Sequence, residues 1–124
     1  MRHPVLWVFY YSVAMACAQV LMKMGTNRIG EFAIKQAMDI FPLLLKIALN
    51  PFIFGGVVLL VSSFFLWLYI ISFFQLALIF PLTAMIYVFV EVLSYFILGE
   101  KLLWANYGGI ALIALGIFFL LYKY

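Results

Sequence analysis

The chain has 124 residues, of which 70% are hydrophobic and only 9% are charged, and its formal net charge is +3. Soluble domains carry roughly 25% charged residues, so this composition excludes a globular protein whose surface faces water. The small basic excess is typical of the topology signals of membrane proteins and gives no reason to expect a nucleic-acid partner. Because Cys17 is the only cysteine, an intrachain disulfide and a cysteine-based metal cluster are also excluded.

Four stretches reach the length of about 20 mostly apolar residues that a helix needs to cross a bilayer. They comprise residues 4–24, 51–74, 76–98 and 102–122. Tyrosine and tryptophan cluster near their ends, as they do in the aromatic belts of membrane interfaces. The sequence therefore predicts an all-α fold, in which a single membrane domain over residues 1–124 forms a four-helix bundle in the lipid bilayer.

Local signals set the limits of these spans. Asn50 followed by Pro51 is typical of a helix start, because asparagine caps the first turn and proline fits its first position. The Gly-Glu-Lys sequence of residues 99–101 is the polar break between the third and fourth spans. The join near Gln75 is so short that the second and third spans are expected to form a tight helical hairpin.

Residues 26–49 form the long connection, which is predicted to contain an amphipathic helix lying in the membrane interface. Apolar side chains recur there at helical spacing against charged ones: Ile29, Phe32, Ala33, Ala37, Ile40 and Phe41 against Arg28, Glu31, Lys35 and Asp39. Pro42 is expected to interrupt this helix, so that residues 43–49 form a second interfacial turn. The alternative is a structured loop packed on the spans.

Glu91 lies well inside the third span, where inserting a charged side chain costs about 2.5–3.5 kcal/mol. The polar residues that share its face of the predicted helix are Thr83, Tyr87, Ser94 and Tyr95. One interpretation is a cavity-lining carboxylate that binds a cation, an amine or a proton. The other is a protonated glutamate that holds the bundle together by a hydrogen bond to a serine or tyrosine of a neighbouring helix.

A second polar stripe runs along the first span. It comprises Ser12, Met15, Gln19 and Lys23, mostly four residues apart and close to one face of the helix. A glutamine one turn below a lysine at membrane depth suits a phosphate or carboxylate head group. The alternative is that Lys23 merely extends its amine to the interface while its stem stays in lipid.

The fourth span is rich in small residues and has no ionisable group between Lys101 and Lys123. Gly109 and Gly116, with Leu112 between them, predict a face for close helix packing, either within the chain or between subunits. The sequence contains no phosphate-binding loop, metal-ligand spacing, nucleophile motif or pair of catalytic carboxylates. We therefore expect no enzymatic activity, no cofactor and no metal site.

Several short motifs occur in an order that resembles the drug/metabolite transporter superfamily. Its four-span class includes small multidrug resistance proteins and EamA-like flippase subunits. The motifs are Gln19-Val20-Leu21-Met22-Lys23, Asn50-Pro51 with Gly55-Gly56, Trp67-Leu68-Tyr69, Leu78-Ile79-Phe80-Pro81-Leu82, Leu98-Gly99-Glu100-Lys101, and Gly108-Gly109-Ile110-Ala111-Leu112-Ile113 through Gly116. None is specific alone, so the resemblance rests on their order and spacing along nearly the whole chain.

Within this superfamily, the resemblance favours one branch. Multidrug members carry a glutamate in the middle of the first span that binds drug and proton in turn, and Met15 stands at that position here. The end of the first span, the amphipathic loop and the Asn50-Pro51 start look more like subunits of the 4-amino-4-deoxy-L-arabinose-phosphoundecaprenol flippase. That resemblance implies a bacterial inner-membrane protein that moves a polyprenyl-phosphate-linked amino sugar. From charge, we expect Lys23 and Gln19 to meet the phosphate and Glu91 the sugar amine.

Four helices are few to enclose a translocation path. We therefore expect a homodimer, or a heterodimer with a related small membrane protein, with the fourth span at the seam. Two alternatives stay open. One is an exporter of small cationic compounds or metabolites, of the small multidrug resistance type, and the other is a membrane adaptor that transports nothing. The basic residues of the first loop favour an orientation with both termini outside the cytoplasm.

Overall fold

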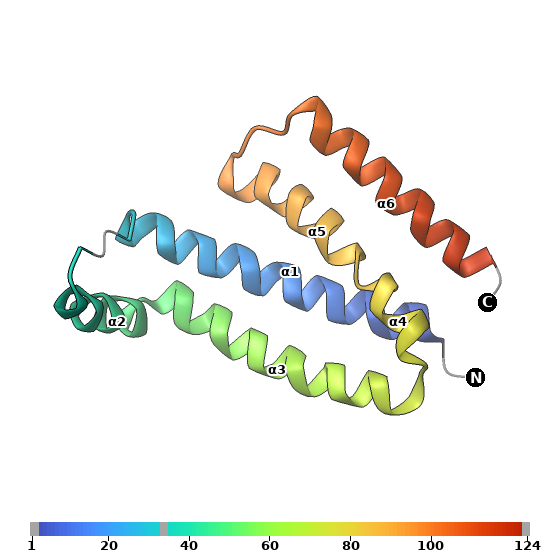
Figure 1. The fold of residues 1–124 in the computed structure, drawn as a ribbon, viewed down its shortest axis with the longest axis horizontal. Coiled ribbons are helices and arrows are strands. Elements are labelled where there is room, and N and C mark those ends of the chain that lie inside the picture. The colour runs from blue at the N-terminus through green and yellow to red at the C-terminus, as the bar shows by residue number, and fades with distance from the viewer. Residues whose placement is uncertain (1–2, 33–34, 123–124) are drawn as a thin grey trace.

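The computed structural model describes residues 3–32 and 35–122, which consist of helices and short connections (Figure 1). Four helical stretches are long and apolar enough to cross a membrane: Pro4–Ile29, Pro51–Phe73, Leu76–Leu98 and Trp104–Tyr122. The predicted all-α, four-helix membrane bundle is confirmed, and the protein is a multi-pass membrane protein. The first span continues to Ile29, beyond its predicted end at residue 24.

The spans lie in a row, with α1 (Pro4–Ile29) between α3 (Pro51–Phe73) and α5 (Met85–Leu93) (Figure 1). The fourth span, α6 (Trp104–Tyr122), lies beyond α5 and packs on α4 and α5. Since α1 has a neighbour on two sides, its side chains face both α3 and α5. Cavities that involve the polar stripe of the first span can therefore form on either side of α1.

Asn50 confirms the predicted start of the second span. Its Oδ1 atom accepts hydrogen bonds from the backbone N–H groups of Phe52 and Ile53, at 3.0 and 3.2 Å. Its Nδ2 atom donates to the carbonyl oxygen of Gly25 at 3.3 Å. One side chain therefore caps α3 and also ties it to the last turns of α1.

Glycine allows α1 and α3 to approach closely. A Cβ atom added to Gly56 would lie 2.6 Å from Cγ of Met22 and 3.0 Å from the carbonyl oxygen of Ala18. A Cβ atom on Gly25 would overlap the side chain of Ile53 in the same way. With a larger residue at either position, the two helices could not lie this close together.

The connection after the first span departs from the predicted amphipathic helix. Residues 26–29 belong to α1, and the described residues between α1 and the next turn, Phe32 and Lys35 among them, are not helical; Ala33 lies outside the described residues. A short 3-10 turn, η1 (Ala37–Asp39), leads directly into α2 (Ile40–Leu49). Pro42 does not interrupt this helix, because it lies in the first turn, where a backbone N–H has no partner within the helix.

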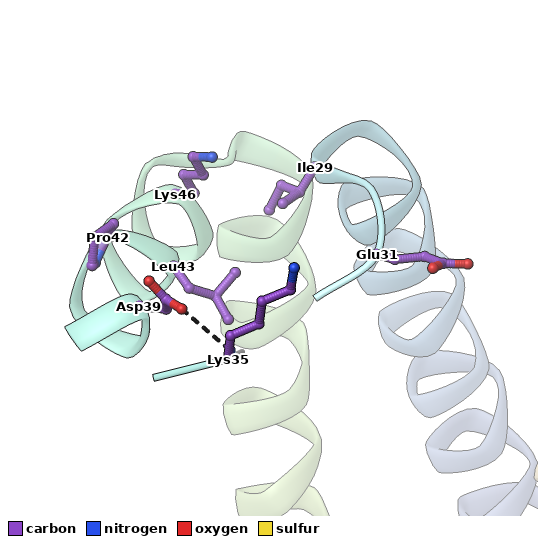
Figure 2. Close-up of a pocket in the computed structure, with 7 residues that line it drawn as sticks. All are labelled: Ile29, Glu31, Lys35, Asp39, Pro42, Leu43 and Lys46. Atoms are coloured by element: carbon purple, nitrogen blue, oxygen red, sulfur yellow. Dashed lines mark hydrogen bonds between the residues drawn. The ribbon is translucent and has the colours of Figure 1, made fainter. Parts of the chain in front are cut away.

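Asp39 fixes the entry to α2. Its Oδ2 atom accepts a hydrogen bond from the backbone N–H group of Lys35 at 3.2 Å (Figure 2) and another from that of Gln36 at 3.1 Å. The carboxylate therefore closes the turn that precedes the helix. As a result, Lys35 is held beside the start of α2, on the side that faces the end of α1 (Figure 2).

The third span consists of three segments: α4 (Leu76–Leu82), α5 (Met85–Leu93) and the π-helical turn η2 (Ser94–Leu98). Since α3 ends at Phe73 and α4 begins at Leu76, the predicted tight hairpin near Gln75 is confirmed. Pro81 causes the break that follows, because it has no N–H to donate. The chain tightens there into three-residue turns, with Ala84 N–H donating to the carbonyl of Pro81 at 3.1 Å.

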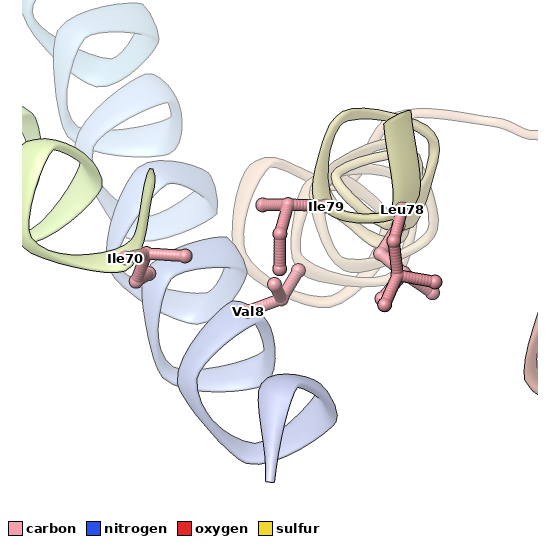
Figure 3. Close-up of a cluster of buried hydrophobic side chains, with 5 residues drawn as sticks. Val8, Ile70, Leu78 and Ile79 are labelled. Atoms are coloured by element: carbon pink, nitrogen blue, oxygen red, sulfur yellow. The ribbon is translucent and has the colours of Figure 1, made fainter. Parts of the chain in front are cut away.

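The buried core lies near the start of the chain, where α1, the end of α3 and α4 meet. Val8, Ile70, Leu78, Ile79 and Leu82 form it, and the first four are labelled in Figure 3. Most other apolar side chains are exposed on the surface of the chain. Lipid must cover them, since leaving that much apolar area in water is unfavourable.

Candidate functional site

A cavity of about 240 Å³ lies between α1 and the C-terminal part of the third span. Its lining comes from α1, from α5 and η2, and from the loop after them: Gln19, Val20 and Lys23, then Val90, Ser94 and Leu98, then Glu100. Gln19 and Lys23 are four residues apart and so share one face of α1. The structure therefore brings these two predicted ligand residues into one cavity.

Lys23 and Glu100 give the cavity one positive and one negative side chain. Within the described residues, the Lys23 amine has no carboxylate at ion-pair distance. Both Gln19 and Lys23 are exposed, whereas Val20 between them is buried and supplies an apolar wall. An incoming anionic group can thus reach the Lys23 amine without first breaking an ion pair.

The π-helical turn η2 explains why Ser94 and Glu100 line this cavity. The Ser94 carbonyl accepts hydrogen bonds from the backbone N–H groups of both Gly99 and Glu100, the latter at 3.2 Å. Gly99 has a φ of +68°, a left-handed conformation that glycine adopts without strain. The chain folds back at this point and leaves Glu100 at the cavity. Sequence analysis placed Glu100 only in a loop, although the glycine before it signals such a closure.

The other predicted ligand residues lie outside this cavity. Tyr87 and Tyr95 are 64% and 48% exposed, and the hydroxyl of Thr83 donates to the carbonyl of Phe80 at the break in the span. Glu91 is half-buried but is absent from the cavity lining. The reason is helical geometry: α5 turns Val90 toward α1, and the next residue points about 100° away.

Glu91 lacks the partner that a purely structural role requires. Its Oε2 atom is buried and has no hydrogen-bond partner among the described residues, and the same holds for the Oγ atom of Ser12 on α1. A buried polar group without a partner is destabilising by about 1–3 kcal/mol. The hydrogen bond to a neighbouring serine or tyrosine, expected if Glu91 only holds helices together, is therefore not observed.

A second, apolar cavity of about 370 Å³ lies between α1 and α3. Its lining is largely aromatic: Tyr11, Met15, Leu60, Val61, Phe64, Phe65 and Trp67. The rings of Tyr11 and Trp67 lie 5.1 Å apart between centroids. Sequence analysis missed this groove, although Leu60, Phe64 and Trp67 follow the i, i+4, i+7 spacing of one helix face. None of its lining residues carries a carboxylate, so no neighbour of Met15 in this groove supplies the acidic group that multidrug members have at this position.

The predicted packing face of the fourth span is not used inside the chain. Among the described residues of α6 none is buried, and a Cβ atom added to Gly109 or Gly116 would meet nothing within 4 Å. Leu112, between them, is 71% exposed. The small-residue face of α6 is therefore free to meet lipid or a second subunit.

The substitutions Gly109→Leu and Gly116→Leu are expected to dissociate an oligomer built on this face, because large side chains prevent close helix approach. The monomer fold should be unchanged, since neither position contacts the rest of the chain. Cross-linking and size-exclusion chromatography in mild detergent measure the oligomeric state. An oligomer that withstands both substitutions would show that α6 is not the seam.

Comparisons of the chain with protein-family models, with curated proteins and with solved structures give no match. The resemblance to the drug/metabolite transporter superfamily accordingly stays a prediction from the motifs of the sequence.

Proposed function

We propose that the chain is a subunit of a small membrane transporter or flippase. Its substrate would be a polyprenyl-phosphate-linked amino sugar or a similar amphiphile with a phosphate group. The observation that supports this proposal is the cavity in which Lys23, without an ion pair among the described residues, lies beside Gln19 and the buried Ser94. The cavity lies beside α1, which is long and apolar enough to cross the membrane. A lipid-linked head group could therefore enter it while the lipid tail stays in the bilayer.

Electrostatics favours a phosphate as the ligand of Lys23. A phosphate that leaves water for a low-dielectric site must be met by positive charge, because the desolvation penalty otherwise prevents entry. The Lys23 amine supplies that charge, and Gln19 and Ser94 supply uncharged hydrogen-bond donors. Glu100, on the other side of the same cavity, could receive an amine of the head group. A head group with one phosphate and one amine would therefore match both charges.

The groove around Met15 weakens the main alternative, an exporter of small cationic compounds. The residues that line this groove include no carboxylate, so it lacks the acidic side chain with which multidrug members bind their cations. The groove instead offers aromatic and aliphatic surface. We therefore favour an amphiphilic anionic substrate over a cationic one, with a homodimer or a related small protein completing the transport path.

Replacing Lys23 by methionine tests the proposed function directly. The stem and its apolar packing remain while the charge is lost, so affinity for a polyprenyl-phosphate-linked amino sugar should fall by about tenfold or more, as expected for a lost charged hydrogen bond. Lys23→Arg should retain much of the affinity. Binding and translocation are measured with protein reconstituted in lipid vesicles.

Lys101→Met is the matched control, because Lys101 lies in the loop next to Glu100 but does not line the cavity. It should bind the substrate as the unchanged protein does. Equal losses in Lys23→Met and Lys101→Met would indicate general surface electrostatics. Undiminished binding in Lys23→Met would refute the phosphate role of Lys23.

A further inference from the structure

The helix α2 is too short to cross the membrane, and it leaves most of its apolar side chains exposed on the protein. Its ten residues extend only about 15 Å, half the thickness of the hydrocarbon core. Its exposed apolar side chains are Ile40, Phe41, Leu44, Leu45 and Leu49, the last of which is 80% exposed. Because α2 connects two membrane spans, the acyl region of the leaflet is available to cover these side chains.

A cavity of about 350 Å³ lies beside α2, on the side that faces the end of α1 (Figure 2). Ile29, Pro42 and Leu43 form its apolar part, and Glu31, Lys35, Asp39 and Lys46 its charged part. Figure 2 shows the side chain of Glu31 extending away from the other lining residues and from α2. The cavity therefore combines lysine amines with an apolar wall at the end of the spans.

The amines of the two lysines are not held in ion pairs with the carboxylates that line the same cavity, Glu31 and Asp39. Neither Lys35 nor Lys46 has a carboxylate at ion-pair distance within the described residues. The Asp39 carboxylate accepts hydrogen bonds from the backbone N–H groups of Lys35 and Gln36, at 3.2 and 3.1 Å. Arg28, in the last turn of α1, has its guanidinium carbon 4.3 Å from the centroid of the Phe52 ring and is engaged there. Two unpaired amines thus remain for a ligand.

We propose that this cavity binds the phosphate of an anionic phospholipid from the leaflet in which α2 lies. Lys35 and Lys46 would hold the phosphate, while Leu43 and the exposed face of α2 contact the acyl chains. The two amines without ion pairs favour an anionic ligand, and the apolar face of α2 favours a lipid over a free ion. This site is separate from the Lys23 cavity and does not depend on whether the chain transports a substrate.

The test uses the full chain in nanodiscs of phosphatidylcholine alone or of an equimolar mixture with phosphatidylglycerol. Native mass spectrometry after transfer to mild detergent counts the lipids that stay bound. In mixed nanodiscs the unchanged protein should retain phosphatidylglycerol in preference to phosphatidylcholine. The double variant Lys35→Gln/Lys46→Gln should lower that preference by about thirtyfold, the effect expected of two interfacial lysines near an anionic surface.

Three comparisons make this test decisive. Lys101→Gln removes one positive charge outside the cavity and should leave the preference for phosphatidylglycerol unchanged, and Lys35→Arg/Lys46→Arg should preserve it. An excess of inorganic phosphate should not displace the lipid. The proposal is overturned if the double glutamine variant retains the preference or if Lys101→Gln loses as much. It is also overturned if inorganic phosphate competes, because the site would then hold a free anion.

Discussion

Replacing Gly56 by alanine is expected to push α1 and α3 apart and to lower the free energy of unfolding by about 1–3 kcal/mol, as overpacking does. The new methyl group would lie 2.6 Å from Cγ of Met22 and 3.0 Å from the carbonyl oxygen of Ala18. Met22 can shift its side chain, but the Ala18 oxygen belongs to the backbone of α1. Relief therefore requires the helices to separate, which also disturbs the hydrogen bond from Asn50 to Gly25.

Gly55→Ala is the matched control for this prediction. A Cβ atom on Gly55 meets nothing within 4 Å, yet the residue lies in the same helix one position earlier. Alanine should there raise the stability by up to about 1 kcal/mol, the gain in helix propensity over glycine. Thermal unfolding in the same detergent compares the two variants. If both changes shift the midpoint in the same direction, the close approach at Gly56 is not what holds α1 and α3 together.

Much of the fold follows from short-range signals that the sequence displays. Span length and hydropathy determine where the four helices lie, and Asn50 with Pro51 marks a helix start whose hydrogen bonds the structure confirms. The hairpin at Gln75 follows because two apolar stretches meet there with almost no polar residue between them. These features depend on residues close together in the chain, so no knowledge of tertiary packing was needed.

Features that depend on helix rotation were not predictable in the same way. Gly55 and Gly56 look alike in the sequence, but only Gly56 faces α1, because the rotation of α3 is set by packing. Helix rotation also explains why Glu91 does not line the cavity that contains Lys23. On α5 the preceding residue, Val90, lines the cavity instead. Pro42 was misjudged because a proline disrupts the interior of a helix but not its first turn.

Glu91 lies on a segment that is irregular at both ends. The Pro81 break precedes α5, and the π-helical turn η2 follows it. Both features interrupt regular α-helical hydrogen bonding, and π-turns are frequent at functional sites. A short helical segment between two such points can tilt without melting the whole span. A carboxylate on this segment that changed its charge or its ligand would be well placed to control that tilt.

Glu91→Gln is therefore expected to abolish transport while expression and thermal stability stay near those of the unchanged protein. Glutamine has the same shape and can form the hydrogen bonds of a protonated glutamate, but it can neither bind and release a proton nor pair with an amine. Because Oε2 of Glu91 is buried without a partner among the described residues, no observed hydrogen bond is lost in the exchange.

Glu100→Gln separates this role from substrate binding. Glu100 lines the Lys23 cavity and Glu91 does not, so Glu100→Gln should weaken substrate affinity, whereas Glu91→Gln should leave binding intact and stop translocation. Equilibrium binding and vesicle translocation, measured on the same preparations, distinguish the two effects. Full translocation by Glu91→Gln would mean that a neutral polar side chain suffices at this position. Glu91 would then serve helix packing rather than the proposed transport.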